Sequence, residues 1–442
     1  NILFIVIDSL RADKVFGKNK TSKIPNIESL IKNGVYFEQA ICSTPATGVS
    51  VSSIFTGLYP FKIGMGSEKY QKFNPKIRSC IQILKENDYN TYATSPEITN
   101  DLGIVCDFEN PDKSYNNYFS LFAGLGNQII QKISASYLKK PWFFYIHIFD
   151  LHKPVVVPKK FDNEKFGASP YARAVSGLDY WIGKILERLD MKQTLLILTS
   201  DHGNLIPKDN KSDSDIEPDL KLGLNLGKRI MPKFTHSAGA KFLNATRNTI
   251  TKVKLANENK KLTPYDVRSR RPHFVLSLFD EHIRIPLIFS GYNVSPKKTS
   301  QQVQNLDIFP TIAEIIKLPK KNNMIDGRSL FDAFENNITE KPAYLHTMPN
   351  KSISVNDAVG IRTSKYKYFR HSRDSKKNVN LYDLQNDPQE NHNIAKQHSD
   401  IVKEMEQIIS KMTNYRQEKQ EPAVDEDIKK KIEEEYKKLG YL

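Results

Sequence analysis

Ser43-Thr-Pro-Ala-Thr-Gly-Val-Ser-Val-Ser-Ser-Ile-Phe-Thr-Gly-Leu-Tyr-Pro60 is the stretch on which the interpretation of this sequence depends. Proline favours an extended conformation in the residue before it, and the apolar positions that follow predict a short helix ending at Gly57. A hydroxyl group therefore lies at the start of a helix. Unpaired backbone N–H groups and the helix dipole favour phosphate or sulfate there. The alternative is an N-cap, which Ser and Thr form for structural reasons alone.

Three apolar runs elsewhere in the chain, at residues 1–7, 143–148 and 194–200, are typical of buried strands in a parallel sheet. Helical patterns at residues 25–34 and 169–189 alternate with these runs. Alternation of strands and helices indicates that helices cover the sheet. We therefore predict an α/β fold with a large, mostly parallel central sheet and helices on both faces.

Polar residues follow each of the three runs, and the carboxyl ends of parallel strands form the crevice in which such sheets bind ligands. Asp8 follows the first run, His152 and Lys153 lie just beyond the second, and Asp201-His202-Gly follows the third. A carboxylate and an imidazole next to each other at a tight turn can both reach one cation. The structural alternatives are an N-cap for Asp8 and a hydrogen-bonded structural histidine for His152.

These segments together resemble the sulfatase-like branch of the alkaline phosphatase superfamily. The resemblance rests on Asp-x-Leu-Arg-Ala-Asp at residues 8–13, Thr-Gly-Leu-Tyr-Pro at 56–60, His-x-x-Asp-x-His-x-Pro at 147–154 and Thr-Ser-Asp-His-Gly at 199–203. A Tyr-Asp-Leu-x-Asn-Asp-Pro-x-Glu stretch begins at Tyr382. The resemblance covers nearly the whole chain apart from one insertion.

In this family the reacting residue lies ten positions before the glycine of the Thr-Gly-Leu-Tyr-Pro ending, which places it at Thr47. True sulfatases carry Cys or Ser there, within Cys/Ser-x-Pro-x-Arg, and oxidise it to formylglycine. Thr47-Gly-Val-Ser-Val has neither the Cys nor the Pro and Arg. We therefore do not expect formylglycine chemistry. We expect a threonine alkoxide held by a metal ion instead.

The resemblance implies one divalent metal ion (Ca, Mg, Mn or Zn) held by Asp8, Asp201 and His202, with Thr47 as the nucleophile. His152 would contact the transferring group as a catalytic residue. Lys153 would add positive charge for substrate binding, and Ser50 is also assigned to substrate binding.

Residues 207–272 are rich in Lys, Asn and Asp and show no clean periodicity. We interpret them as an insertion that forms a lid or a substrate-recognition loop, with a disordered surface excursion as the alternative. The family has a further active-site histidine in this region, and His236, His273 and His282 are candidates. We select His273 as catalytic by its spacing before the next strand, and assign His236 to substrate binding.

The character of the chain changes after residue 340. Alternating patterns at residues 358–370 and 380–384 predict a small antiparallel sheet, followed by two helices. We therefore divide the chain into a catalytic domain (1–340) and a C-terminal α+β subdomain (341–442).

The formal net charge of +15 attracts polyanions, although the even spread of Lys favours a general compositional bias instead. No nucleic-acid motif and no apolar run of membrane-spanning length occur. The expected partner is an anionic ester substrate, such as a polysaccharide or a lipid headgroup, and the oligomeric state stays open.

The three cysteines, Cys42, Cys80 and Cys106, are interpreted as core thiols. Their odd number and the absence of a signal peptide favour a cytoplasmic location. The chain begins without Met, so we leave open whether a segment precedes it in the natural protein. The compartment therefore stays undecided.

The sequence thus predicts a metal-dependent sulfatase-like hydrolase or transferase that acts on phosphate esters through a threonine nucleophile. A sulfatase without formylglycine is the second interpretation. A non-catalytic, polyanion-binding member of the fold is the third.

Overall fold

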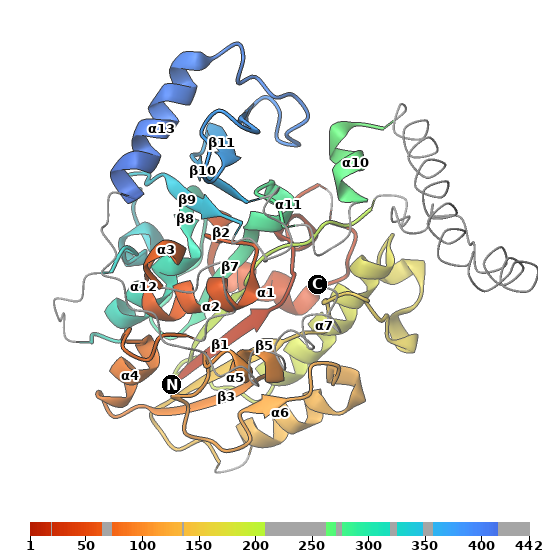
Figure 1. The fold of residues 1–442 in the computed structure, drawn as a ribbon. Coiled ribbons are helices and arrows are strands. Elements are labelled where there is room, and N and C mark those ends of the chain that lie inside the picture. Colours follow the sequence, from red (N-terminus) through yellow and green to blue (C-terminus); the bar gives the residue numbers. More distant parts are fainter. Residues whose placement is uncertain are drawn as a thin grey trace, which may run out of the picture.

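The structure is a computed structural model, and it describes residues 1–18, 20–63, 73–134, 137–207, 262–270, 276–318, 325–347 and 357–413. None of the helices in this part of the chain combines the length and the apolar character that a membrane span requires. Two sheets organise the described residues, a large one in the centre of the molecule and a small one above it in the view of Figure 1.

The large sheet has eight strands in the order β4-β3-β5-β1-β6-β7-β2-β8. β1 lies between β5 and β6 and is parallel to both. β7 runs antiparallel to its two neighbours, whereas the remaining pairs are parallel. The strands are β1 (Ile2–Ile7), β2 (Gly34–Ile41), β3 (Asn90–Pro96), β4 (Ser114–Tyr115), β5 (Trp142–Ile148), β6 (Leu195–Thr199), β7 (Arg284–Gly291) and β8 (Lys297–Gln304).

Helices cover both faces of this sheet, because successive side chains of a strand point to opposite faces and both faces are apolar. Ile2, Phe4 and Val6 of β1 pack with α2 (Thr47–Thr56), α4 (Cys80–Lys85) and α12 (Ile308–Ile315). The alternate residues of β1 pack on the other face with α1 (Pro25–Asn33), α6 (Leu125–Ser134) and α7 (Pro170–Leu186). The predicted fold class is confirmed.

Two predicted helix ends are also found where the sequence placed them. Gly34 follows the last residue of α1. Gly57 follows α2 with a φ of 68°, a left-handed conformation that glycine adopts without steric cost. The stretch at residues 43–60 therefore folds as an extended approach followed by a short helix.

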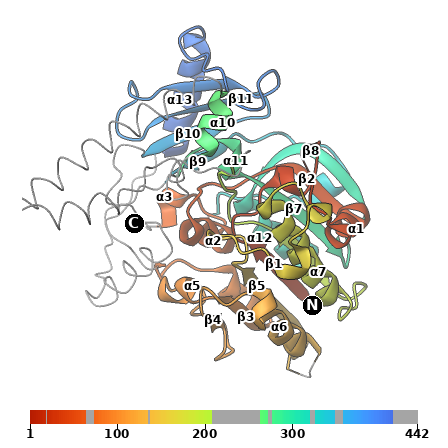
Figure 2. The ribbon, with the colours of Figure 1, turned by 90° about the vertical axis from the view of Figure 1, so that its right-hand side faces the viewer.

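The small sheet is antiparallel, in the order β12-β11-β10-β9, and α13 (Ser399–Thr413) packs on it through Met405 and Ile409. Its strands are β9 (Ala343–His346), β10 (Ala358–Arg362), β11 (Tyr366–His371) and β12 (Asn380–Asp383). In Figures 1 and 2, α10 (Pro264–Ser269) stands beside this sheet, and the Tyr265 backbone N–H donates to Asn391 Oδ1. The division at residue 340 stays a prediction.

Short elements join these parts. They are the helices α3 (Pro60–Ile63), α5 (Glu97–Asp101) and α11 (Asp280–Ile283) and the 3₁₀ turns η1 (Ala12–Lys14), η2 (Leu121–Ala123), η3 (Lys159–Phe161), η4 (Glu164–Phe166), η7 (Asn305–Asp307) and η8 (Phe331–Phe334). Most of the predicted insertion and the second closing helix lie outside the described residues. The prediction of a lid is therefore not addressed by the described part of the chain.

One prediction about the cysteines is wrong. Cys42 and Cys80 are buried as expected, but Cys106 is exposed. Cys106 lies in the turns that follow α5 rather than in a helix or strand. Its side chain therefore has no sheet or helix face to pack against.

The junction of α1 and β2 leaves no room for a side chain at Gly34. A Cβ atom there would lie 2.2 Å from the carbonyl oxygen of Phe289 on the adjacent strand β7. We expect Gly34→Ala to lower the free energy of unfolding by about 1–3 kcal/mol, as overpacking does, in urea denaturation followed by circular dichroism. The exposed neighbour Asn33→Ala is the control. Equal stability of the two variants would contradict the tight packing of β2 on β7.

Candidate metal centre and reaction pocket

The carboxyl ends of β1 and β6 bring Asp8, Asp201 and His202 together, and the first residue of α2, Thr47, faces them. His202 Nε2 lies 3.7 Å from Asp8 Oδ1 and 3.5 Å from Asp201 Oδ2. The Thr47 hydroxyl donates to Asp8 Oδ1 at 3.3 Å and lies 3.1 Å from His202 Nε2. These four residues share one site although Asp8 and His202 are 194 positions apart in the sequence.

Thr47 does not cap α2. The N-cap position is Ala46, which makes no side-chain capping hydrogen bond. The N-cap alternative for this stretch is therefore wrong, because the Thr47 hydroxyl faces a carboxylate and an imidazole rather than the backbone of its own helix. The first-turn N–H groups of α2, which have no partners within a helix, begin at that hydroxyl.

A second imidazole, that of His147, completes the cluster from β5. One ligand atom each of Asp8, His147 and Asp201 lies within 4.8 Å of the others. Asp8 Oδ2, Asp201 Oδ2 and His147 Nε2 are buried, and within the described part of the chain none of them has a hydrogen-bond partner. Buried unpaired carboxylate oxygens are costly, so this donor set fits a divalent cation.

The tautomer of His202 is determined by its neighbour. Its Nδ1 lies 2.7 Å from the carbonyl oxygen of Gly203, which can only accept a hydrogen bond, so Nδ1 carries the proton. Nε2 therefore faces Asp8 and Asp201 with its lone pair when the ring is neutral, the arrangement typical of a metal-binding histidine.

Burial and neighbouring charges shift the pKa values in this cluster. Burial raises the pKa of both Asp8 and Asp201, and the Asp8 charge adds to the shift at Asp201. Burial opposes the charged form of His202, but the two carboxylates outweigh it and raise its pKa. Burial lowers the pKa of His147 to about 4, which leaves a neutral imidazole at pH 7. A neutral imidazole is the form that binds metal.

The turn after His202 packs directly on α11. A Cβ atom on Gly203 would lie 2.0 Å from the Glu281 carbonyl oxygen, so only glycine fits here. The Gly203 backbone N–H also donates to the His282 carbonyl oxygen at 2.7 Å. This contact brings His282 to the site.

A small pocket opens in front of the cluster. Its lining residues are Ser9, Pro45, His152, Lys153, His202, Gly203, Asn204, Leu276 and His282. Burial lowers the pKa of His152 to about 4, and its Nδ1 lies 2.9 Å from the Lys153 carbonyl oxygen. Lys153 Nζ donates to the Leu205 carbonyl oxygen at 2.8 Å, and burial lowers its pKa to about 8. The pocket thus has a lysine that is still cationic at neutral pH.

The family assignment follows from comparison with known proteins. A family model described as Sulfatase matches residues 1–318. This chain belongs to the sulfatase family. A second model, described as N-sulphoglucosamine sulphohydrolase, C-terminal, matches residues 275–435. Proteins of the family hydrolyse esters and bind a divalent metal ion.

Relatives of this sulfatase-family chain are distant. N-acetylgalactosamine-6-O-sulfatase of Bacteroides thetaiotaomicron is 24% identical over 300 residues, which are 62% of this chain and only 48% of that protein. Arylsulfatase K of Mus musculus is 20% identical over 453 residues, covering 94% of this chain and 79% of that one. The crystal structure of phosphonate monoester hydrolase of Agrobacterium radiobacter matches with a TM-score of 0.65 at 14% identity, over 93% of this chain and 95% of the other. That likeness shows the fold.

Of the other predicted residues of this sulfatase-family site, the structure describes only Ser50. Ser50 is fully buried and does not line the pocket. Its hydroxyl donates to the Asp201 carbonyl oxygen at 2.6 Å and accepts from Asn305 Nδ2 at 2.9 Å, so it holds α2 against the end of β6. His236 and His273 lie outside the described residues, and their roles stay predictions.

Two further histidines belong to this site, one not expected from the sequence and one considered but not chosen. His147 lies inside the apolar strand β5, so its sequence neighbours do not mark it as a site residue. Its partner in the sheet is Val6, which lies on the face covered by α2, and His147 therefore lies on that face too. His282 was weighed against His273 and set aside. His282 directly precedes β7. If β7 had been predicted as antiparallel to β6, its first residues would have been expected at the same edge of the sheet as the carboxyl end of β6, next to Asp201.

We expect Asp201→Asn to abolish the rise in melting temperature that Ca, Mg, Mn or Zn gives the wild-type protein. Without metal, the variant should be more stable than wild type, because one of two buried like charges is removed. Thermal unfolding with metal analysis of the dialysed protein measures both. Asp179→Asn is the control, since Asp179 is buried but accepts from Ile27 at the start of α1. Undiminished metal binding by Asp201→Asn would exclude this site.

Proposed function

We propose that this chain is a metal-dependent hydrolase or transferase that cleaves phosphate esters with Thr47 as the nucleophile. One observation carries the proposal. The Thr47 hydroxyl lies at the amino end of α2, within 3.3 Å of Asp8 and His202, and next to buried ligand atoms that have no partner among the described residues. A hydroxyl between an acceptor pair and a helix N-terminus suits attack on an anionic ester.

Asp8, Asp201 and His202 would hold the cation, with His147 beside them as a fourth donor. A divalent cation at this place lowers the pKa of a neighbouring hydroxyl and neutralises charge on a phosphate oxygen. The chain's own residues then account for binding, orientation and proton movement.

In the first step, Thr47 Oγ1 forms a bond to phosphorus while the bond from phosphorus to the ester oxygen breaks. The Thr47 proton passes to Asp8 Oδ1, the carboxylate oxygen that already accepts its hydrogen bond. The first-turn N–H groups of α2 and the Lys153 ammonium stabilise charge on the phosphate oxygens. The leaving oxygen keeps the electron pair and takes a proton from His152, whose protonated form the bound anion favours.

In the second step, water attacks phosphorus and the bond from phosphorus to Thr47 Oγ1 breaks. Oγ1 keeps the electron pair and takes back its proton from Asp8 Oδ1, which restores the threonine and releases phosphate. His152, now neutral, accepts a proton from that water. If an acceptor alcohol takes the place of water, the same step makes the chain a transferase.

Sulfate-ester hydrolysis is the second candidate. It is favoured by the two relatives described above, both named as sulfatases. It is disfavoured by Thr47, because threonine cannot provide the formylglycine of true sulfatases. The non-catalytic interpretation requires that buried, unpaired ligand atoms of Asp8, His147 and Asp201 be retained without a use, which is energetically unfavourable.

We expect Thr47→Ala to reduce turnover of an aryl phosphate by about 1,000-fold or more, because the nucleophile is removed. Thr47→Ser keeps the hydroxyl and should retain turnover. Each variant is assayed with Ca, Mg, Mn and Zn on aryl phosphate, aryl phosphodiester and aryl sulfate. Wild-type activity in Thr47→Ala would contradict the mechanism, and a preference for aryl sulfate would favour the second candidate.

Lys153 predicts the alkaline limit of substrate binding. Its pKa of about 8 lies below the ordinary lysine value of about 10.4, so its charge is present below pH 8 and is lost above it. The KM for aryl phosphate should therefore rise above about pH 8. Lys153→Arg should move this rise to higher pH, because guanidinium stays charged.

Steady-state kinetics between pH 6 and pH 10 measure the effect of Lys153. The exposed Lys159→Met variant is the control, since Lys159 lies in η3 outside the pocket. A Lys153→Met variant whose KM follows the same pH profile as wild type would show that another group sets the limit.

A further inference from the structure

The short helix α11 lies between the metal centre and the small C-terminal sheet. On one side of it, the Gly203 backbone N–H donates to the His282 carbonyl oxygen at 2.7 Å, and the Glu281 carbonyl oxygen leaves no room for a Cβ atom at Gly203. Gly203 directly follows Asp201 and His202 in the sequence. The turn that carries these two residues therefore packs on α11.

The other side of α11 contacts two cations of the C-terminal sheet. Arg362 of β10 binds the Asp280 carboxylate through Nε at 2.9 Å and Nη2 at 2.8 Å. Lys367 Nζ, from β11, lies 2.5 Å from the same carboxylate and donates to the Leu278 carbonyl oxygen at 3.0 Å. Burial opposes the charge of Asp280, but the two cations outweigh it and hold its pKa below the ordinary range. The first residue of α11 is thus held as a carboxylate by the small sheet.

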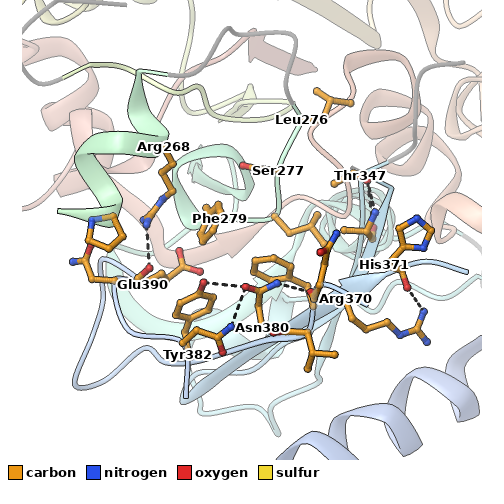
Figure 3. A pocket seen from close by; sticks show the side chains of 18 of the residues that line it. Arg268, Leu276, Ser277, Phe279, Thr347, Arg370, His371, Asn380, Tyr382 and Glu390 are labelled. Atoms are coloured by element: carbon orange, nitrogen blue, oxygen red, sulfur yellow. Dashed lines mark hydrogen bonds between the residues drawn. The ribbon is translucent and has the colours of Figure 1, made fainter. Parts of the chain in front are cut away.

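Glu390, in the loop after β12, belongs to the same cluster. Its Oε1 lies 2.7 Å from Lys367 Nζ, and its Oε2 accepts from the Asp280 backbone N–H at 2.8 Å. Its carbonyl oxygen accepts from Arg268 of α10 at 3.0 Å, as Figure 3 shows. Arg268 also binds Glu281 at 2.8 Å. Three cations and three carboxylates therefore meet around α11, and their formal charges cancel.

Aromatic contacts support the same face of β11. Phe279, directly before α11, packs against Phe369 and Tyr382 with ring centroids 5.3 and 5.8 Å apart (Figure 3). Lys367 and Phe369 are two positions apart on β11, so their side chains point to the same face of the small sheet. This face therefore meets α11 through both an ion pair and an aromatic contact.

The ion pair is buried, and burial makes it costly. The Lys367 and Glu390 side chains have no exposed surface. Apolar residues of similar size often stabilise a fold at least as well as a buried ion pair does, because buried charges lose their hydration. Such a pair does restrict geometry, since the Lys367 ammonium has acceptors on three sides, from Asp280, Glu390 and Leu278. Lys367 thus restricts α11 to one position relative to the small sheet.

We infer that Lys367 is a positioning residue for the metal centre. Through Asp280 and Glu390 it fixes α11, and α11 fixes the turn that carries Asp201 and His202. The inference rests on the proposed function, because it concerns the metal centre that the proposed reaction uses. It gives the C-terminal sheet a part in catalysis, although none of the described residues of β9–β12 lines the reaction pocket.

The variant that tests this role removes the ion pair rather than one partner. Lys367→Met alone would leave Glu390 buried beside Asp280 without its cation, a change that strongly destabilises proteins. Lys367→Met/Glu390→Gln removes both charges, and the glutamine oxygen can still accept from the Asp280 backbone N–H. The Asp280 carboxylate keeps Arg362 as its partner.

Arg370→Met/Glu406→Gln is the matched control. Arg370 also lies on β11, and it binds Glu406 at 2.9 Å. Arg370 is three positions from Lys367, so its side chain points to the opposite face of the sheet. Glu406 belongs to α13. The control pair therefore joins β11 to α13 and has no contact with α11.

The first measurement is the affinity of the metal-free proteins for Ca²⁺, Mg²⁺, Mn²⁺ and Zn²⁺, by calorimetry well below their melting temperatures. We expect Lys367→Met/Glu390→Gln to bind the preferred cation about tenfold more weakly, as changes behind metal ligands do, and the control to bind it as wild type does. Equal affinities in the two double variants would overturn the inference, because a merely structural role lowers only the melting temperature. Absence of binding by wild type would overturn it as well.

The second measurement is turnover of an aryl phosphate at increasing cation concentration. The concentration that gives half-maximal turnover should rise about tenfold in Lys367→Met/Glu390→Gln, while the KM for aryl phosphate at saturating cation stays at the wild-type value. Weaker cation binding by this variant, with no turnover by wild type, would contradict the proposed function and leave the role of Lys367 in place. Turnover with the same cation dependence in wild type and both variants would overturn that role and leave the function.

Discussion

Two buried carboxylates, those of Asp8 and Asp201, lie at the ends of the adjacent central strands β1 and β6, and the cost of burying them is the constraint on which the site depends. Neither can reach water, since both side chains are fully buried. Asp201 Oδ1 accepts from the backbone N–H groups of Ser9 and His202 at 3.2 and 2.8 Å. Ser9 adopts a left-handed backbone conformation with a φ of 61°, a strain typical of functional sites. The second carboxylate oxygens, Asp8 Oδ2 and Asp201 Oδ2, have no hydrogen-bond partner among the described residues and are available to a cation.

The remainder of the fold holds these charges in place. The parallel register of β1 with β5 and β6 fixes the relative height of the strand ends. Ser50 and Asn305 tie α2 to the end of β6 from behind, so the Thr47 hydroxyl stays within reach of Asp8 and His202. A site of this kind depends on rigid elements, because shifts of about an ångström disrupt such geometry.

Local order was enough to predict the fold class and to mark Asp8, Asp201 and His202, because these residues directly follow apolar runs. The place of Thr47 in the same site came from the resemblance to sulfatase-like proteins. His147 could not be found in this way, since it lies inside a strand and only the sheet pairing shows which face it occupies. The buried partners of Ser50 are likewise tertiary, and periodicity contains no information about them. The exposure of Cys106 depends on how the turns after α5 lie against the core.

The antiparallel direction of β7 has a consequence for how such a chain can diversify. β6 ends and β7 begins at the same edge of the sheet, the edge where Asp8 and Asp201 lie. The polypeptide that joins them therefore both leaves and re-enters the sheet beside the reaction pocket. Insertions or deletions in that connection leave every strand register untouched. The length of this connection can therefore vary beside the carboxylate cluster without any change in the strands that position Asp8 and Asp201.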